Sequence, residues 1–363
     1  MVAFAARRVK KRSFGAVIRQ TIGFILLIEA MLVFKLTSAE PPAFQGPGLL
    51  KRARVVFVQD PEAISAFEPR AERLGPMVER GLVTLTGRNS ASEAWQSLMS
   101  TQEVVGIKVL SAPGKTSGTR PAVAGAVIHS LLAAGFPPEQ IIVWDKHLAD
   151  LRLAGFQELV QRYGVRLAGS VDEGYDRKAE YETPLIGKPV WGDYEFGKSG
   201  EGVGRKSFVS KLVTLQITKI VHVTPLLNHN LTGVSGNLFG LAFGSVDNTI
   251  RFESGPKHLA TAIPEIYALP QLGDRVVLNI VDALICQYQG EETMLLHRSA
   301  MLGQLRFSLD PVALDVLSIE ELNRQRRLKE IPAVTSNFQV YTNASDLELG
   351  VSDLRKIDLI RVP

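Results

Sequence analysis

The sequence predicts an α/β fold in which a mostly parallel β-sheet is flanked by helices on both faces. Three consecutive segments carry this prediction: a buried strand at residues 104–110, a helix at 122–134 and a second strand at 141–144. Apolar residues of the helical segment recur about every 3.6 positions, and Gly135 follows it as glycine does at helix C-termini. The three segments form one βαβ unit, whose strands are expected to run parallel with a right-handed crossover.

Other segments before and after this unit continue the alternation. A first strand is expected from Ala53 to Asp60, and Ser90–Ser100 has the pattern of an amphipathic helix. A helix at 156–163 and a strand at 165–167 follow the βαβ unit. Such alternation is typical of a mostly parallel sheet covered by helices, and such sheets bind ligands at the carboxyl ends of their strands.

Residues 170–210 depart from this alternation. They contain several aromatic residues and a glycine-rich run at 196–204. We interpret them as an antiparallel hairpin excursion that covers the ligand edge of the sheet. Their GxG pattern follows no strong strand-to-helix transition, so it does not indicate a dinucleotide-binding fingerprint.

The C-terminal third is expected to return to strands and helices. Residues 307–329 have the pattern of a helix, with Asp310 as its N-cap and Pro311 as its first residue. We expect four further elements there: a helix at 258–269, a strand at 275–281 that ends beside Asp282, and strands at 338–341 and 357–362.

Composition excludes several classes of protein. The chain has 363 residues, of which 45% are hydrophobic, and 31 glycines, as a globular protein with many tight turns would have. Its net charge of +4 comes largely from a basic cluster before residue 20. The rest is near neutral and lacks the basic surface expected of a nucleic-acid-binding protein. The single cysteine, Cys286, excludes an internal disulfide and a cysteine-ligated iron–sulfur cluster within this chain.

Residues 1–39 have the three parts of an export signal. A basic segment at 7–19 precedes an apolar stretch at 21–36, and the small residues Thr37-Ser38-Ala39 follow as a cleavage site. The signal is of the Sec or the Tat-like type, because Lys11-Arg12-Ser13-Phe14 loosely resembles a twin-arginine motif. The protein is therefore expected to be exported to a periplasmic or other extracytoplasmic location.

Two alternatives for this segment remain open. Residues 21–36 could stay uncleaved as an inner-membrane anchor, although Glu29 and Lys35 interrupt the apolar run. The segment could instead be a basic amphipathic helix packed on the domain. Contact with a membrane is expected only through this N-terminal segment. A linker rich in proline and glycine at 40–50 then leads to the α/β domain at 51–363.

The stretch from His222 to Asn248 gathers the most chemically capable groups in the sequence. An apolar run enters a turn rich in His, Asn, Thr, Ser and Gly, and a helix of small residues follows. His229 in the turn is the first candidate for catalysis, together with Asp247 and Asp282 from neighbouring strand ends. His222, His229 and Asp282 could alternatively hold a divalent metal, since imidazole and carboxylate suit zinc, manganese or iron. His222 could equally be a hydrogen-bonded core histidine.

A second set of polar residues is predicted to contact a ligand. Lys108 lies on a buried strand, so it must either pair with an acid such as Asp145 or Asp282, or face an anionic ligand in a cleft. Ser235 could act as a nucleophile, although its surroundings lack the G-x-S-x-G form. Asn237 could orient a ligand or cap the following helix. The predicted ligand-binding residues are Lys108, Asp145, Asn228, Asn230, Thr232, Ser235 and Asn237.

Several of these segments occur in the order of a known family. The chain resembles the bacterial and archaeal "domain of unknown function 362" (DUF362) family over roughly residues 100–325. The segments that carry the resemblance are VVGIKVL, TRPAVAGAVIHSLLAAG, IIVWD, IVHVTPLLNHNLTGVSGNLFG, VDALICQYQG and SLDPVALD. The resemblance raises the weight of His229 and implies no general activity.

The chain also departs from the family's pattern. Leu227-Asn228-His229 stands where the family usually has Lys-Thr-His, and Gly236 replaces a second lysine. Glu291-Glu292 stands where the family often has Gly-Pro. The resemblance therefore implies that an anion held by those lysines in relatives is bound differently here or not at all.

Two functions remain open from the sequence. The first is an exported enzyme that hydrolyses or isomerises a small anionic substrate in a polar cleft at the strand C-terminal ends. The second is a non-catalytic periplasmic protein for ligand binding or maturation. The cofactor is unknown; a divalent metal is the one considered, and no nucleic-acid partner is expected.

Overall fold

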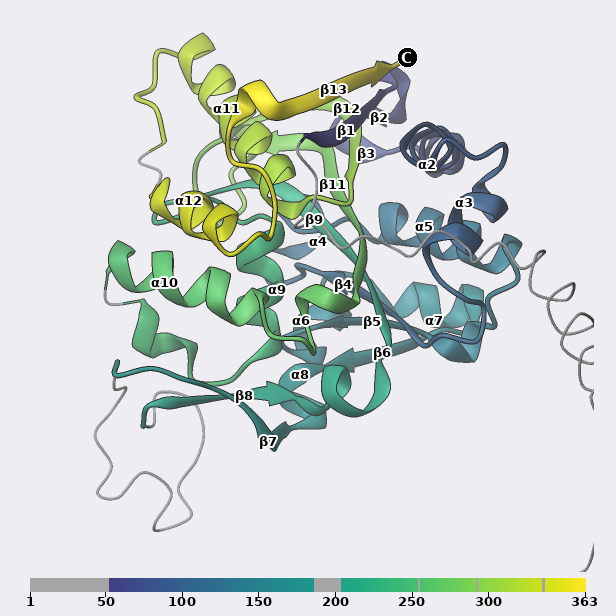
Figure 1. Cartoon of the computed structure of the whole chain (residues 1–363). Helices are drawn as coiled ribbons and strands as arrows, with labels where there is room; N and C mark the ends of the chain where they lie inside the picture. The colour runs from purple at the N-terminus through teal and green to yellow at the C-terminus, as the bar shows by residue number, and fades with distance from the viewer. Residues whose placement is uncertain (1–51, 186–203, 254, 292, 335–336) are drawn as a thin grey trace, which may run out of the picture. The chain divides into compact units, whose positions relative to one another are not determined.

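The computed structural model describes residues 52–185, 204–253, 255–291, 293–334 and 337–363. A nine-stranded sheet forms the centre of this part of the chain (Figure 1). Its order is β13 (Ile357–Val362), β1 (Ala53–Gln59), β12 (Ser299–Ser308), β11 (Val276–Gln287), β9 (Lys219–His229), β4 (Val105–Val109), β5 (Ile141–Asp145) and β6 (Arg166–Gly169), with β10 (Gly233–Val234) paired to β9.

Most pairs in the sheet are parallel, as predicted. Strands β11, β9, β4, β5 and β6 run parallel to one another, and β13 runs parallel to β1. Strand β12 lies antiparallel between β1 and β11, and the short β10 is antiparallel to β9. The α/β class predicted from the βαβ unit is therefore confirmed.

Helices cover both faces of the sheet (Figure 1). Apolar side chains of the first group pack with strand residues such as Val223 and Phe307: α2 (Ala71–Thr86), α3 (Ala91–Leu98), α5 (Pro121–Ala133) and α7 (Gln157–Tyr163). The second group packs on the opposite face with residues such as Trp144 and Val281: α9 (Asn237–Ser245), α10 (Pro256–Tyr267), α11 (Pro311–Leu328) and α12 (Gln339–Asp346). Shorter elements connect these layers: β2 (Ile64–Ser65), β3 (Glu68–Pro69), α4 (Gly114–Ser117), α6 (Leu148–Leu153), α8 (Ser170–Glu173) and a 3₁₀ turn at Thr249–Phe252.

Local signals in the sequence set the ends of several helices. The Ser90 side chain accepts a hydrogen bond from the Glu93 N–H and caps α3. Asp310 caps α11 in the same way, accepting from the Ala313 N–H, and Pro311 is the first residue of that helix. These caps satisfy backbone donors that a helix leaves unpaired at its start. Both predicted helix starts are confirmed.

Two predictions about the strands differ from the structure. Residues 338–341, predicted as a strand, form the start of α12, where Val340, Tyr341 and Ala344 are buried on one helical face. A short apolar run fits either period, so sequence alone did not decide between them. Strands β9 and β11 are also longer than predicted, because they pair with each other as far as Leu227 and Gln287.

The predicted excursion at 170–210 contains an antiparallel pair, β7 (Tyr175–Glu182) and β8 (Lys206–Ser210). Residues 186–203 lie outside the described part, and so does most of the glycine-rich run. The buried Arg251 fastens the pair: its guanidinium donates to the carbonyls of Tyr181 and Leu185 and to the Ser207 hydroxyl. The predicted antiparallel hairpin is confirmed for its two strands.

The predicted export signal at 1–39 and linker at 40–50 also lie outside the described residues. The described residues all fall within one of the two units into which the chain divides, Gly46–Pro363. In this described part, every helix is too short or too polar to cross a membrane.

Two buried carboxylates hold α9 and α11 in place. Asp315 of α11 accepts hydrogen bonds from the backbone N–H groups of Asn237 and Leu238, the first two residues of α9. Asp310 accepts from Ala313 and from the Val351 N–H of a later loop. Burial raises the pKa of Asp310 to about 7 and that of Asp315 to about 6, although these hydrogen bonds oppose the shift.

We predict that the stability contributed by Asp310 and Asp315 falls as the pH rises. Because the folded-state pKa values lie above the ordinary 3.8, the folded protein holds protons that the unfolded chain releases. The contribution is fully present below pH 3.8 and is lost as the pH rises through about 6 and about 7. Chemical unfolding between about pH 4 and about pH 8 should therefore show a flatter pH dependence in Asp310→Asn/Asp315→Asn. Asp346→Asn, an exposed control, should keep the wild-type dependence, and an unchanged slope in the double variant would contradict the prediction.

Candidate functional site

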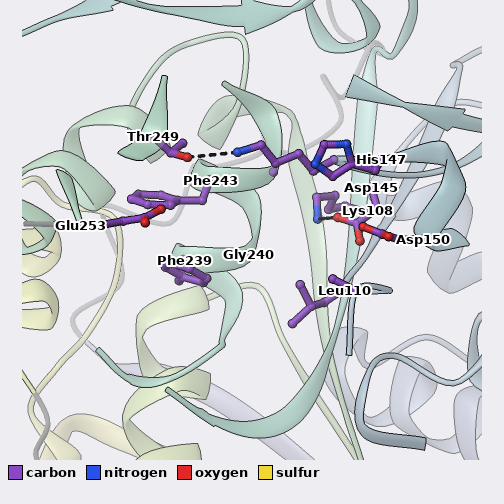
Figure 2. Close-up of a pocket in the computed structure, with 13 residues that line it drawn as sticks. Lys108, Leu110, Asp145, His147, Asp150, Phe239, Gly240, Phe243, Thr249 and Glu253 are labelled. Atoms are coloured by element: carbon purple, nitrogen blue, oxygen red, sulfur yellow. Dashed lines mark hydrogen bonds and ion pairs between the residues drawn. The ribbon is translucent and has the colours of Figure 1, made fainter. Parts of the chain in front are cut away.

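A cavity of about 340 Å³ lies at the carboxyl ends of β4 and β5, against α9. Figure 2 shows Phe239 and Phe243 on one side of it and Lys108, Asp145 and Asp150 on the other. The lining residues are Lys108, Leu110, Ala112, Asp145, Lys146, His147, Asp150, Phe239, Gly240, Phe243, Gly244, Thr249 and Glu253. Parallel α/β sheets place their ligand sites at this end of the strands, because strand-to-helix loops meet there.

A buried ion pair between Lys108 and Asp145 forms part of the cavity wall. Lys108 Nζ donates to Asp145 Oδ1 at 2.7 Å and to the Val109 carbonyl at 2.7 Å. Asp145 Oδ2 accepts from both the N–H and the hydroxyl of Ser111, each at 2.7 Å. Burial disfavours the charged carboxylate, but the Lys108 ammonium and the Ser111 donors hold the Asp145 pKa below its ordinary value. Sequence analysis left Asp145 and Asp282 open as the acidic partner of Lys108, and the structure shows that Lys108 pairs with Asp145.

Two glycines allow α9 to pack directly on this pair and its neighbour. A Cβ on Gly244 would overlap the Lys108 side chain, and a Cβ on Gly240 would lie 3.2 Å from His222 Nε2. The spacing of four residues puts both glycines on one face of the helix. Phe239 and Phe243, whose ring centroids are 4.8 Å apart, provide the apolar wall of the cavity.

Sequence analysis missed five polar residues that line the cavity. Lys146, His147 and Asp150 come directly after β5, and Thr249 and Glu253 lie beyond α9. The rule that ligands bind where parallel strands end could have identified the first three, since Asp145 was already placed at such an end. Lys146 Nζ donates to Thr249 Oγ1 at 3.0 Å and joins two sides of the cavity.

Asp150 has an unusual environment for a carboxyl group. Burial raises its pKa, His147 opposes this, and the charge of Asp145 adds to the increase. Asp145 and Asp150 therefore have pKa values shifted in opposite directions within one cavity. Such a pair can provide one group that holds a proton and one that stays ionised, which is the requirement for acid–base chemistry.

Asp282 does not line the cavity and is held in another ion pair. It lies inside β11, where Oδ1 is 2.7 Å from Arg120 Nη1 and Oδ2 accepts from the Arg120 backbone N–H at 3.0 Å. Arg120 is the residue before α5, so the carboxylate also lies at the positive end of that helix. This partner could not be predicted from the sequence, because the two residues are 162 positions apart.

His222 is completely buried in β9, and both of its ring nitrogens lack a hydrogen-bond partner within the described residues. It is therefore a core histidine, but not the hydrogen-bonded one considered above. Burial and the Lys108 charge lower its pKa well below the ordinary value, so the ring is neutral. An unsatisfied buried polar atom costs about 1–3 kcal/mol.

His229 lies at the far end of the same strand. Seven residues of extended chain separate it from His222, or roughly 23 Å at about 3.3 Å per residue. Its Nδ1 accepts from the Thr232 N–H at 3.1 Å, and its ring packs on Phe239 with a centroid distance of 4.4 Å. Burial lowers the pKa of His229, against the effect of Glu291. His229 thus touches a residue of the cavity wall from outside.

The predicted metal set is not brought together. A single ion cannot bind both His222 and His229 at such a separation, and Asp282 is occupied by Arg120. Among the residues that the structure describes, no three His, Cys, Asp or Glu side chains are grouped so that they could hold a metal.

The other predicted loop residues hold the backbone of the loop. Asn228 Oδ1 accepts from the Glu291 N–H, and the Glu291 carboxylate accepts from the Asn230 N–H. Thr232 Oγ1 donates to the Val234 carbonyl. Ser235 is buried and does not line the cavity.

Asn237 and Asp247 also have structural contacts, at the two ends of α9. The Asn237 amide donates to Asp315 at 2.8 Å. Asp247 Oδ1 accepts from the Phe208 N–H at 2.6 Å and so ties β8 to the end of α9. Of the predicted ligand-binding residues, Lys108 and Asp145 line the cavity and the other five do not; none of the three predicted catalytic residues lines it.

Comparisons with known proteins identify a family. The model of the family described as "Domain of unknown function (DUF362)" matches residues 105–320, which include every lining residue of the cavity and all of α9. A search of curated proteins gives no match. A crystal structure of a protein from Thermotoga maritima, a structural-genomics target, is similar with a TM-score of 0.38 and 11% identity. The match covers 78% of this chain and 60% of that one, so this chain spans less than two thirds of the other protein's length.

We predict that removing only one charge of the Lys108–Asp145 pair destabilises the protein more than replacing both charged residues together. Asp145→Asn leaves a buried ammonium without its counter-charge and should lower the free energy of unfolding by about 3–5 kcal/mol. Lys108→Met/Asp145→Asn should be less destabilised than the sum of the two single variants, because neither charge then remains alone. Chemical unfolding measures the free energy of unfolding of Asp145→Asn, Lys108→Met and the double variant.

Asp353→Asn, which breaks the exposed Arg355–Asp353 pair, is the matched control and should remain close to the wild type. A loss in Asp145→Asn no larger than in this control would contradict the prediction.

Proposed function

The chain belongs to the DUF362 family, and from this premise we propose that its cavity binds a small molecule with an anionic group. The family description carries no activity, so the argument must come from the residues of the site. The observation that supports it most is the completely buried Lys108 in the cavity wall. Its ammonium has three N–H donors, and the two acceptors found for it in the described residues are Val109 O and Asp145 Oδ1. The ammonium also lies 5.5 Å from the centre of the Trp144 ring, and we propose that its remaining N–H donates to the anionic group of a ligand.

The remaining lining suits a compact acid with an apolar part. Lys146 and Glu253 add one side chain of each charge, while the charge of Asp145 is balanced by Lys108. Phe239 and Phe243 offer an apolar surface for the rest of the molecule. A volume of about 340 Å³ lies at the lower end of the range of small-molecule sites.

Catalysis is a second candidate, favoured by the opposite pKa shifts of Asp145 and Asp150. In this proposal Asp150, with His147 beside it, is the proton donor or acceptor for hydrolysis or isomerisation of the bound acid. We assign this role to Asp150 and His147 in place of the predicted His229, Asp247 and Asp282. Those three residues do not line the cavity. Without a grouped set of metal ligands in the described part of the chain, no step is assigned to a metal.

We further propose that the protein acts outside the cytoplasm, as a periplasmic or other extracytoplasmic protein. The basic segment, the apolar stretch at 21–36 and the small residues before Glu40 support this proposal. A non-catalytic ligand-binding or maturation role would fit the same location.

We predict that Lys146→Met weakens the binding of small acids by about 10- to 100-fold, because a charge-assisted hydrogen bond contributes about 1.5–3 kcal/mol. Calorimetry with a panel of small carboxylates and phosphates measures the affinities of the full chain. Lys115→Met, which removes an exposed lysine outside the cavity, should bind as the wild type does. Equal affinities in both variants, or no binding to the wild type, would refute the anionic-ligand proposal. Asp150→Asn should abolish any turnover of a bound acid while leaving its binding within about threefold.

We predict that the protein isolated from the extracytoplasmic fraction begins after Ala39, as cleavage of an export signal requires. N-terminal sequencing of the protein from each cell fraction gives the answer. An intact Met1 in the membrane fraction would instead support the anchor, and an intact Met1 in the cytoplasm would overturn export.

A further inference from the structure

Three buried polar side chains lie next to one another on the sheet face beneath α9. His222 of β9 is the register partner of Asn279 of β11, and Thr224 follows two residues later on the same face of β9. All three side chains are fully buried, with an exposed fraction of 0%. They form a polar cluster in the centre of the sheet, which we call the inner cluster.

The Asn279 amide nitrogen donates to the Leu309 carbonyl at 3.4 Å, but within the described part of the chain the other polar side-chain atoms of the inner cluster lack hydrogen-bond partners. His222 Nδ1 and Nε2, Thr224 Oγ1 and Asn279 Oδ1 have none within the residues that the structure describes. More than nine in ten buried polar groups in native proteins are paired with protein or with an ordered water. Four unpaired atoms on three neighbouring residues therefore indicate a missing common partner rather than separate defects.

The inner cluster is adjacent to the cavity. Gly240, which lines the cavity, lies over it, since a Cβ on Gly240 would be 3.2 Å from His222 Nε2 and 3.7 Å from Thr224 Cγ2. Lys108 is the register partner of His222 on the neighbouring strand. Neighbouring strands are about 4.8 Å apart, so the cluster begins one strand away from the backbone of Lys108, whose ammonium is proposed to hold the anionic group.

We propose that the inner cluster is a binding site for a hydroxyl-type oxygen, supplied by an enclosed water or by the ligand itself. A hydroxyl both donates and accepts hydrogen bonds, which matches a neutral imidazole, a threonine hydroxyl and an amide oxygen. A cation is disfavoured by the nearby Lys108 charge. Where the ligand supplies the oxygen, the substrate class is a short hydroxy acid. This second case rests on the proposed function, whereas the water does not.

Thr224→Val tests the site because it removes the hydroxyl and keeps the shape of the side chain. Thr224→Ser is the control, since it retains the hydroxyl. The first measurement is chemical unfolding without any ligand. The second is calorimetry on two pairs of acids that differ only by a hydroxyl: lactate and propionate, and 3-hydroxybutyrate and butyrate.

An enclosed water predicts that Thr224→Val is less stable than both the wild type and Thr224→Ser. A ligand hydroxyl predicts instead that Thr224→Val is as stable as the wild type or more so, but loses a preference of about tenfold for the hydroxy acids. Either result supports the inner cluster as a binding site for a hydroxyl-type oxygen. A Thr224→Val variant that is equally or more stable and leaves the relative affinities unchanged overturns it. If no acid binds at all, the acid-binding proposal fails, and the unfolding measurement still decides whether the inner cluster holds a water.

Discussion

The close contact between α9 and the sheet is the constraint on which the site depends. Three glycines, spaced four residues apart, lie on the helix or just before it, and each faces a buried polar side chain. Gly236 faces Asp315, Gly240 faces His222, and Gly244 faces Lys108. A side chain at any of these positions would overlap or press on its partner, so the helix approaches the sheet as closely as it does only because its contact face is bare.

This contact buries charged side chains, and each of them needs a partner of opposite charge inside the protein. A helix so close to the sheet excludes water from Lys108, which must then have an acceptor inside the protein, and Asp145 provides it. Another ion pair, Arg120–Asp282, is buried in the same way at the start of α5. The two pairs differ in one respect that matters for function: Lys108 and Asp145 line a cavity, whereas Arg120 and Asp282 do not. Only the first pair can meet a ligand.

Much of the fold could be predicted from the sequence, because the signals that set it are local. The periodicity of residues 122–134 and the Asp310–Pro311 cap depend on neighbours a few positions away. The site was less predictable, because its contacts join distant residues. Lys108 and Asp145 were identified from their places at strand ends, whereas nothing near Asp282 in the sequence indicates Arg120 as its partner. The turn around His229 is rich in polar residues, but most of them form hydrogen bonds that hold the loop backbone.

The departures from the family pattern acquire a physical meaning in this structure. At position 236 a lysine would have to displace the Asp315 carboxylate that holds the start of α9, so glycine and Asp315 fit together as a set. Leu227 is completely buried on β9, where a lysine would need a counter-charge. Glu291 has a left-handed backbone with φ of 51°, and its side chain holds the Asn230 N–H in the loop. At these three positions the residues present are therefore part of the packing that holds the loop and the start of α9. Lys108 and Lys146 are the lysines that line the cavity.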